Sequence, residues 1–250
     1  MTNELYKMIF KRKSFHLFRN TGDGNITESE LADIKNVFEN AERLYPDIKT
    51  ELRIVPARDI GFRRDAEYCL LIYSEKKDNY LMNAGYIGEQ LDLYLVAQNM
   101  GTLWYGIGKP DKKQSDGLEY VIMLAVRKVT NASMFRKDMF AAKRKPLSET
   151  WQGGTLGAAE IARFAPSACN SQPWFVKNEN GSLTVFRHKP NRRIGIMSIV
   201  NAEYFNPIDM GIYLCILEIC LAENGVKTQR TLFTDTADAE YIKLAEYRLV

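Results

Sequence analysis

Apolar and polar positions along the first half of the chain predict a helix, two buried strands and a second helix between them. TESELADIKNVFENAERL has apolar residues at helical spacing behind an acidic start, which predicts a helix with Thr27 as its N-cap. The segments AEYCLLIYSE and YVIMLAV are short apolar runs rich in β-prone residues, so both are predicted to be buried strands. Between them, NAGYIGEQLDLYLVAQNMG carries apolar residues on one face and is predicted to be a core helix that stops at Gly101.

The second half repeats this layout. LGAAEIARFA is predicted to be a helix, and PWFVKNENGSLTVFRH a hairpin that turns at Asn180 and Gly181. GIYLCILEICLAENG is predicted to be another apolar helix, ending at Gly225. We interpret the two halves as a diverged duplication, and the alternative is two unrelated core helices.

A polar, basic stretch that carries Pro146 separates the two halves. We interpret MFRKDMFAAKRKPLSETWQGG as a connector, which divides the chain into a first half (1–130), a connector (131–155) and a second half (156–250).

Composition and charge exclude several classes of function. The 250 residues are 46% hydrophobic and 26% charged, as in an ordinary globular protein. The net charge of +3 is not gathered into a block of five like charges, so no nucleic-acid partner is predicted. The N-terminus has no apolar leader, and the most apolar run is short of the roughly 20 residues that span a bilayer. We therefore expect a cytoplasmic protein without a membrane segment.

The cysteines and histidines do not indicate a metal or dithiol centre. Cys69, Cys169, Cys215 and Cys220 form no CxxC pair, and the chain has only two histidines. No metal ligand is therefore assigned, and redox chemistry would require an organic cofactor.

One loop concentrates polar residues at a predicted junction between a helix and a strand. In FAPSACNSQPW the helix is predicted to end at Phe164 and the strand to begin near Trp174, which would expose Ser167, Asn170 and Gln172 to a planar, polar-edged ligand. The alternative is a turn whose Ser and Asn side chains bond their own backbone.

This loop resembles the APSxxNxQPW segment of the nitroreductase family, whose members are FMN-dependent α+β oxidoreductases. The resemblance extends over ten residues. It implies that the flavin is contacted by Pro166, Ser167, Ala168, Asn170 and Gln172.

Three further segments resemble family motifs. KRKSFHLF is similar to the Arg-x-Ser motif that binds the FMN phosphate, which implies roles for Arg12, Lys13 and Ser14. AAKRKPLSE is similar to the distal basic tract, which implies that Lys143 and Arg144 close over the same phosphate. MGTLWYGIGKP is similar to the GLGTxWxG segment, which implies that Gly106, Ile107 and Gly108 approach the flavin edge; the alternative is a simple glycine-rich turn.

His16 departs from the family pattern. The family commonly has a cation at this position, near the flavin N1 and O2 atoms. His16 is therefore either a donor to that edge or a structural residue, and no other protein residue is assigned a certain catalytic role because the flavin itself carries the chemistry.

The motifs are divided between the halves. The phosphate motif stands only in the first half and the APSACNSQPW loop only in the second, so one chain can supply both sides of a single flavin site. This division resembles the fused TM nitroreductase branch of the family. It implies an α+β, nitroreductase-like fold with two pseudo-symmetric halves that form an intramolecular pseudo-dimer.

The resemblance also implies an activity and its reactants. Hydride would pass from NADH or NADPH through bound FMN to a small-molecule acceptor such as a nitroaromatic or a quinone. The alternatives are a flavin-binding protein without turnover, or reductive dehalogenation or ene-reduction on the same fold. We expect the chain to be a monomer or a weak homodimer.

Overall fold

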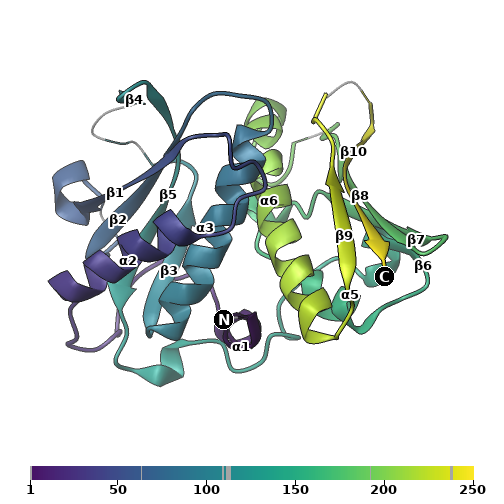
Figure 1. The fold of residues 1–250 in the computed structure, drawn as a ribbon. Helices are drawn as coiled ribbons and strands as arrows, with labels where there is room; N and C mark the ends of the chain where they lie inside the picture. The colour runs from purple at the N-terminus through teal and green to yellow at the C-terminus, as the bar shows by residue number, and fades with distance from the viewer. Residues whose placement is uncertain (1, 63, 109, 111–113, 192, 237–238) are drawn as a thin grey trace.

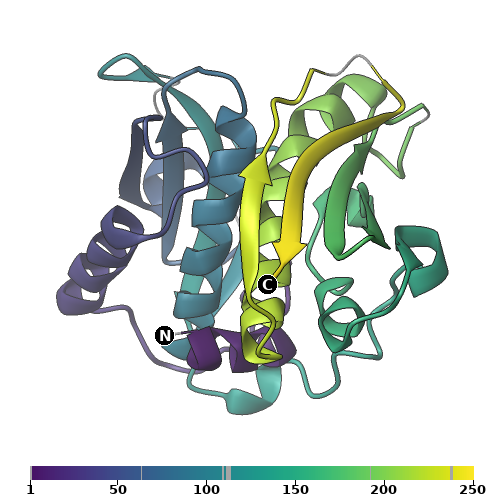
Figure 2. The same cartoon turned by 45° about the vertical axis from the view of Figure 1, so that its right-hand side comes forward.

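Two central helices lie between two antiparallel-rich sheets, and each half of the chain supplies one helix and one sheet (Figures 1 and 2). The computed structural model describes residues 2–62, 64–108, 110, 114–191, 193–236 and 239–250. The α+β class expected from the sequence is confirmed within these residues.

The described residues of the first half form three α-helices, a short 3-10 helix (Ala57–Ile60) and one sheet. Its elements are α1 (Thr2–Lys11), α2 (Glu28–Asn40), β1 (Thr50–Pro56), β2 (Tyr68–Ser74), α3 (Tyr80–Ala97), β3 (Met100–Tyr105), β4 (Gln114–Ser115) and β5 (Leu118–Lys128). The strand order is β1-β2-β5-β3, with β4 paired to β5. Thr27 caps α2 as predicted, because its side chain accepts from the Glu30 amide and the Glu30 side chain accepts from the Thr27 amide.

The second half is entered through α4 (Leu147–Thr150) and β6 (Trp151–Gly153). Its remaining elements are α5 (Gly157–Ala162), β7 (Trp174–Glu179), β8 (Ser182–His188), α6 (Ile199–Glu223), β9 (Thr228–Leu232) and β10 (Tyr241–Leu249). Asn180 and Gly181 connect β7 to β8 with φ of 52° and 73°, the left-handed backbone that a two-residue hairpin turn requires. The strand order is β6-β7-β8-β10-β9.

The two halves share one topology. In each half a helix leads into a strand hairpin, a long helix follows, and two further strands extend the same sheet. The orders β1-β2-β5-β3 and β7-β8-β10-β9 are therefore equivalent, with β6 added to the edge of the second sheet. This equivalence supports the interpretation of the halves as a duplication.

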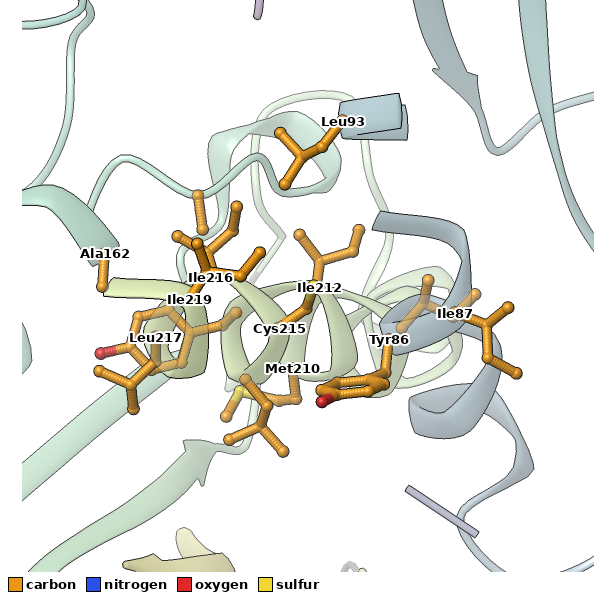
Figure 3. Packing of buried hydrophobic residues seen from close by; sticks show 14 of the residues in the cluster. Tyr86, Ile87, Leu93, Ala162, Met210, Ile212, Cys215, Ile216, Leu217 and Ile219 are labelled. Atoms are coloured by element: carbon orange, nitrogen blue, oxygen red, sulfur yellow. The ribbon is translucent and has the colours of Figure 1, made fainter. Parts of the chain in front are cut away.

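The helices α3 and α6 form the contact between the halves. Both are apolar around most of their circumference because each lies between its own sheet and the other helix. Figure 3 shows part of this core, with Tyr86 and Ile87 of α3 beside Met210 and Ile212 of α6. Fully burying an aliphatic side chain of this size contributes about 1.5–3 kcal/mol, so this contact is a large part of the driving force for folding.

Two glycines allow α3 and α6 to approach each other closely. A Cβ at Gly85 would lie 2.1 Å from the carbonyl oxygen of Ile208, and a Cβ at Gly211 would lie 1.9 Å from the carbonyl oxygen of Met82. Ile208 stands three positions before Gly211, and Met82 stands three positions before Gly85. The contact is therefore reciprocal, as a pseudo-twofold axis between the helices requires.

We expect Gly211→Ala to lower the free energy of unfolding by about 1–3 kcal/mol or more, because the added methyl group meets backbone that cannot rotate away. Urea unfolding measures the change. Gly154→Ala is the matched control, since a Cβ there would make only an ordinary contact of 3.5 Å. Equal stabilities of the two variants would contradict the close helix contact.

The predicted ends of both core helices need correction. The helix α3 ends at Ala97, before Gly101, and the left-handed turn is made by Asn99 with φ of 57°; Gly101 belongs to β3. The helix α6 begins at Ile199 and continues through Pro207, so its apolar stretch is longer than expected. It is the one helix in the described part of the chain that is long and apolar enough to cross a membrane, and 78% of its most apolar window is buried in the protein.

The four cysteines are reduced. Cys69, Cys215 and Cys220 are buried and Cys169 is exposed. Burial raises the pKa of the Cys69 thiol to about 12, which keeps it protonated and unreactive at neutral pH.

Candidate functional site

The segment after α1 carries the Arg-x-Ser motif and is fastened to β3. The Arg12 amide donates to the carbonyl of Met8 (2.8 Å) and so completes the last turn of the helix. The chain then runs beside the strand, where Ser14 pairs with Thr102 and the Phe15 amide donates to the Thr102 carbonyl (2.9 Å). The first strand after the core helix therefore positions the motif.

Arg12 is buried and shares its charge with Asp92 of α3. Its Nε donates to Asp92 Oδ2 (2.8 Å), and the side chain of Asp92 has no solvent exposure. Trp104 Nε1 donates to the same oxygen (2.9 Å), and the Thr102 hydroxyl donates to Oδ1. The Arg12 Nη2 group is also buried, and it has no hydrogen-bond partner.

Two more guanidinium groups gather beside Arg12. The Arg136 amide donates to the Lys11 carbonyl (3.1 Å), which holds the connector against the end of α1. Burial and the charge of Arg12 lower the pKa of Arg136. Burial, followed by the charges of Arg136 and Arg12, lowers the pKa of Arg144 to about 10. We call Arg12, Arg136 and Arg144 the arginine cluster.

The arginine cluster reaches the APSACNSQPW loop through Arg144. Arg144 Nη1 donates to Asn170 Oδ1 (2.9 Å), and its Nη2 donates to the Phe164 carbonyl (3.2 Å). Its Nε is buried without a partner. The structure thus brings together the end of α1, the connector and the loop of the second half, which are far apart in sequence. Two buried N–H groups of the cluster are left to donate to a ligand.

Asp209 of α6 holds the loop in shape. Its two carboxylate oxygens accept from the Ala168 amide at 3.0 and 3.1 Å, and Oδ2 also accepts from the Ser171 hydroxyl (3.0 Å). Within the loop, Ser167 Oγ accepts from the Gln172 amide (3.0 Å). Cys169, Asn170 and Gln172 have φ of 49°, 56° and 47°. Such a concentration of left-handed, non-glycine residues is typical of functional sites, where surrounding contacts maintain a strained backbone.

The loop residues are not all exposed as expected. Asn170 is exposed, whereas Ser167 and Pro166 are half-buried. The expectation for Gln172 is wrong, because only 3% of it is exposed. Its Oε1 accepts from the Lys145 amide (2.8 Å), so its side chain fastens the connector to the loop.

The glycines after β3 make room for protein side chains. A Cβ at Gly106 would lie 2.8 Å from the ring of Phe205, and a Cβ at Gly108 would lie 2.3 Å from the side chain of Met123. Ile107, between them, is 69% exposed. The flavin contact implied for these three residues stays a prediction.

The remaining candidates lie near the arginine cluster in sequence. Lys13 places its Nζ 5.0 Å from the centre of the Phe15 ring, and His16 is exposed, with its carbonyl accepting from Arg64 Nη1 (3.0 Å). The Lys143 carbonyl accepts from both Arg144 Nη1 (2.9 Å) and Asn170 Nδ2 (3.2 Å). Lys143 therefore contacts the loop through its backbone, and the role of His16 stays a prediction.

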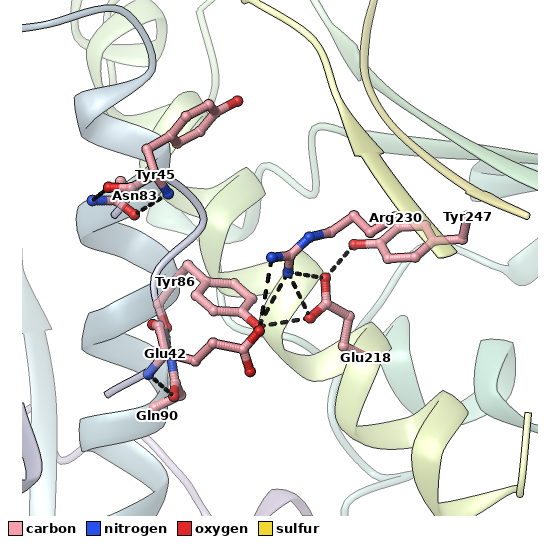
Figure 4. A network of polar contacts seen from close by, with 8 residues as sticks. All are labelled: Glu42, Tyr45, Asn83, Tyr86, Gln90, Glu218, Arg230 and Tyr247. Atoms are coloured by element: carbon pink, nitrogen blue, oxygen red, sulfur yellow. Dashed lines mark hydrogen bonds and ion pairs between the residues drawn. The ribbon is translucent and has the colours of Figure 1, made fainter. Parts of the chain in front are cut away.

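The second half has a counterpart to the Asp92 site, in which a different set of side chains surrounds the carboxylate. Asp92 and Glu218 occupy equivalent positions, 126 residues apart, as do Trp104 and Arg230. Glu218 accepts from Tyr86 (2.6 Å), Arg230 Nη1 (2.8 Å) and Tyr247 (2.5 Å), as Figure 4 shows. The Arg230 guanidinium also lies 5.6 Å from the centre of the Tyr86 ring.

Equivalent positions also hold equivalent loops. Asn83, 126 residues before Asp209, accepts from the Tyr45 amide (3.1 Å) and donates to the Tyr45 carbonyl (3.4 Å). The loop around Tyr45 is thus the first-half counterpart of APSACNSQPW, without its Ser, Asn and Gln pattern.

Acidic residues in the apolar helices were not recognised as site residues from the sequence. These are Glu89, Asp92, Asp209 and Glu218. Their signal is a carboxylate inside an otherwise apolar run, since a buried carboxylate requires a partner. Glu89 is an exception: its buried carboxyl makes no hydrogen bond of normal geometry, although Trp104 is a donor close to it, and burial, followed by the charge of Asp92, raises its pKa well above the usual value.

Asp209 predicts a dependence of stability on pH. Burial raises its pKa from 3.8 to about 8, although the Ala168 and Ser171 donors partly offset the rise. The folded state then holds a proton that the unfolded state releases, so this contribution is full below about pH 4 and is lost as the pH rises towards 8. In this pH range the Asp209 carboxyl should lower the free energy of unfolding of the wild type by up to about 1.4 kcal/mol per pH unit. Asp209→Asn, which reproduces Asn83 of the other half, should remove this decrease.

Urea unfolding of both proteins between pH 4 and 8 measures this difference. We expect the variant to gain stability relative to the wild type as the pH rises. Parallel curves would show that the Asp209 carboxyl does not change its protonation in this range.

Comparison with known proteins decides the family. A family model described as "Putative TM nitroreductase" matches residues 4–221. The chain belongs to this family. A Thermotoga maritima structure described as a "putative nitroreductase" is 19% identical with a TM-score of 0.63, and the match covers 98% of this chain and 93% of that chain. The nitroreductase-like fold expected for this member of the TM nitroreductase family is thereby confirmed.

Two other solved structures are each described as a "putative nitroreductase in complex with FMN". The one from Desulfovibrio desulfuricans is 14% identical with a TM-score of 0.42, and the match covers 58% of this chain and 93% of that chain. The one from Exiguobacterium sibiricum is 12% identical with a TM-score of 0.42, and the match covers 60% of this chain and 95% of that chain. No curated protein matches the chain.

Proposed function

We propose that this TM nitroreductase-family protein is an FMN-dependent oxidoreductase that transfers electrons from NADH or NADPH to a small acceptor such as a nitroaromatic or a quinone. The observation that carries the proposal is the arginine cluster. Its buried Arg12 Nη2 and Arg144 Nε groups lack partners, and Arg144 is bonded to a loop of the flavin-contact type.

The chemistry of this donor set fits the phosphate of FMN. Three guanidinium groups repel one another, and Asp92 supplies the carboxylate that pairs directly with Arg12. A dianionic phosphate would relieve that repulsion and accept from the two N–H groups. Arg12 and Arg144 would hold the phosphate, with Arg136 adding charge, and the Ser14 hydroxyl is close in sequence. The flavin, when bound, supplies the hydride transfer.

The other residues of this chain would orient the cofactor. Asp209 fixes the Ala168 and Ser171 segment of the loop, and Gln172 ties that loop to the connector through Lys145. Because one chain supplies both the phosphate motif and the APSACNSQPW loop, this arrangement also supports a monomeric, pseudo-dimeric protein. Small-molecule reactants and a cytoplasmic location complete the proposal.

The purified protein tests the proposal through its released flavin and its stoichiometry. We expect about one FMN per chain, because the Arg-x-Ser motif and the APSACNSQPW loop each occur once in the sequence and come together at one place through Arg144. Flavin content is read from the absorption spectrum, and the released cofactor is identified by chromatography. Two FMN per chain would refute the single site, and failure to bind FMN would refute the proposed function. Bound FMN without NADH or NADPH oxidation in the presence of acceptors would identify a flavin-binding protein without turnover.

A further inference from the structure

A cavity of about 640 Å³ adjoins the APSACNSQPW loop on the side of the second half. Its walls come from the connector, the loop, the end of β8, the segment that follows it and α6. The described residues that the argument uses are Lys145, Asn170, His188, Arg193, Ile194 and Asn206. A volume of this size accommodates a small organic molecule.

Asn206 places a buried polar side chain at the wall of this cavity. It is 1% exposed, lines the cavity, and its Oδ1 has no hydrogen-bond partner. Buried amide atoms in folded proteins are nearly always bonded to protein or to water, so an unpaired atom at a cavity wall is available to a ligand or a bound water. A carboxamide can present either its oxygen or its NH₂ group after a half-turn of its side chain, so Asn206 can serve a donor or an acceptor.

The charged groups that line the cavity are basic. Lys145 and Arg193 carry positive charge, and none of the described lining residues is acidic. His188 also lines it, and its Nε2 lies 3.4 Å from the carboxylate of Glu240. The Lys145 Nζ donates to the Gln172 carbonyl (3.0 Å), and Arg193 Nη2 donates to the Ile196 carbonyl (3.5 Å). Arg193 is exposed and thus has further N–H groups to offer.

The cavity is joined to the proposed flavin site through one residue. Asn170 lines the cavity and also accepts from Arg144 of the arginine cluster. Ile194 and Pro190 add apolar surface to the wall. A ligand with an apolar ring and a negatively charged group would match both the apolar and the basic residues of the cavity wall.

We propose that this cavity binds the electron acceptor and selects aromatic acceptors that carry a carboxylate, with Arg193 as the specificity-determining residue and Asn206 as a second polar contact. The identification of the ligand as the acceptor rests on the proposed function. The preference for an anionic aromatic molecule rests on the cavity alone.

Binding of 4-nitrobenzoate and the neutral 4-nitrobenzamide tests the preference. Calorimetric titration of the full chain, as purified and after removal of any flavin, should give an affinity at least about fivefold higher for the carboxylate. Arg193→Gln should abolish this difference. Arg58→Gln is the matched control, because the side chain of Arg58 is 88% exposed and pairs with the neighbouring Asp59.

Asn206→Leu separates a ligand contact from a structural role. Replacing an unpaired buried polar atom by an apolar group should leave the stability unchanged or raise it, whereas the affinity for 4-nitrobenzoate should fall by about threefold or more. Equal affinities for the two nitro compounds, or a preference that survives Arg193→Gln, would overturn the assignment of the cavity. Unchanged 4-nitrobenzoate binding in Asn206→Leu would overturn the role of Asn206.

Turnover tests the identification of the ligand. NADH or NADPH and one proton reduce the nitro group to nitroso and water, with two electrons transferred per cycle. Arg193→Gln should raise KM for 4-nitrobenzoate by a larger factor than KM for 4-nitrobenzamide, whereas the control Arg58→Gln should leave the ratio of the two KM values unchanged. If the carboxylate binds selectively and neither nitro compound is reduced while a quinone is, the anion preference and the proposed oxidoreductase function stand and the acceptor assignment is overturned. If no acceptor, quinones included, is reduced by the FMN-loaded protein, the proposed oxidoreductase function is overturned.

Discussion

Arg12→Ala is expected to lower the free energy of unfolding by about 3–5 kcal/mol. The substitution leaves Asp92 buried without its cationic partner, and a buried carboxylate without a counter-charge is strongly unfavourable. Urea unfolding at neutral pH measures the loss. This expectation differs from the one that the motif alone implies, in which Arg12 chiefly binds phosphate.

A double-mutant cycle separates the two roles of Arg12. Asp92→Asn in the Arg12→Ala background should recover part of the lost stability, because the uncompensated charge is removed. Arg12→Lys retains a cation and should be the least harmful of the replacements. If Arg12→Ala is as stable as the wild type and loses only FMN binding, the pair with Asp92 contributes little and the motif interpretation is the better one.

Arg144→Ala is expected to weaken FMN binding by roughly tenfold to a hundredfold. Arg144 has a buried N–H group without a partner, so a charge-assisted bond to the FMN phosphate would contribute about 1.5–3 kcal/mol. Riboflavin lacks the phosphate and should bind both proteins with similar affinity. Fluorescence titration with each flavin gives the two ratios.

Arg163→Ala is the matched control for Arg144. Arg163 lies in the same region, donates to the Lys145 carbonyl (3.3 Å) and already pairs with Glu160 (3.3 Å), so its loss should change FMN affinity little. If Arg144→Ala weakens FMN and riboflavin equally, Arg144 acts by holding the loop through Asn170 and Phe164 instead of binding phosphate.

Local patterns predicted most of the elements because their causes lie within a few residues. The capping box of Thr27 and Glu30, the turn at Asn180 and Gly181, and the apolar runs of β2 and β5 follow from short-range chemistry. Helix ends were less predictable. Gly101 stood at the expected stop of α3, but Asn99 can also adopt the left-handed backbone and made the turn two residues earlier.

The family resemblance located the loop and the basic segments, but not how they are held. Arg12 was expected to face a phosphate, and the structure pairs it with Asp92, which lies 80 positions away. Gln172 was expected at the surface, and it is buried because it accepts from the Lys145 amide. Arg136 was not predicted to be a site residue, because its position beside Arg12 depends on a backbone hydrogen bond between the connector and α1.

By itself the sequence determined the order of elements in each half, the repetition of that order and the separation of the phosphate motif from the APSACNSQPW loop. These properties depend on spacing, turn chemistry and residue type along the chain. Only the tertiary structure decided that Gly85 and Gly211 let the two core helices meet reciprocally, and that this contact brings the arginine cluster to the loop. It also decided that Glu218 and Arg230 pair with each other at the positions equivalent to Asp92 and Trp104. The reason is that burial and charge pairing are set by neighbours distant in sequence, and a side chain's partner exists only after the halves have packed.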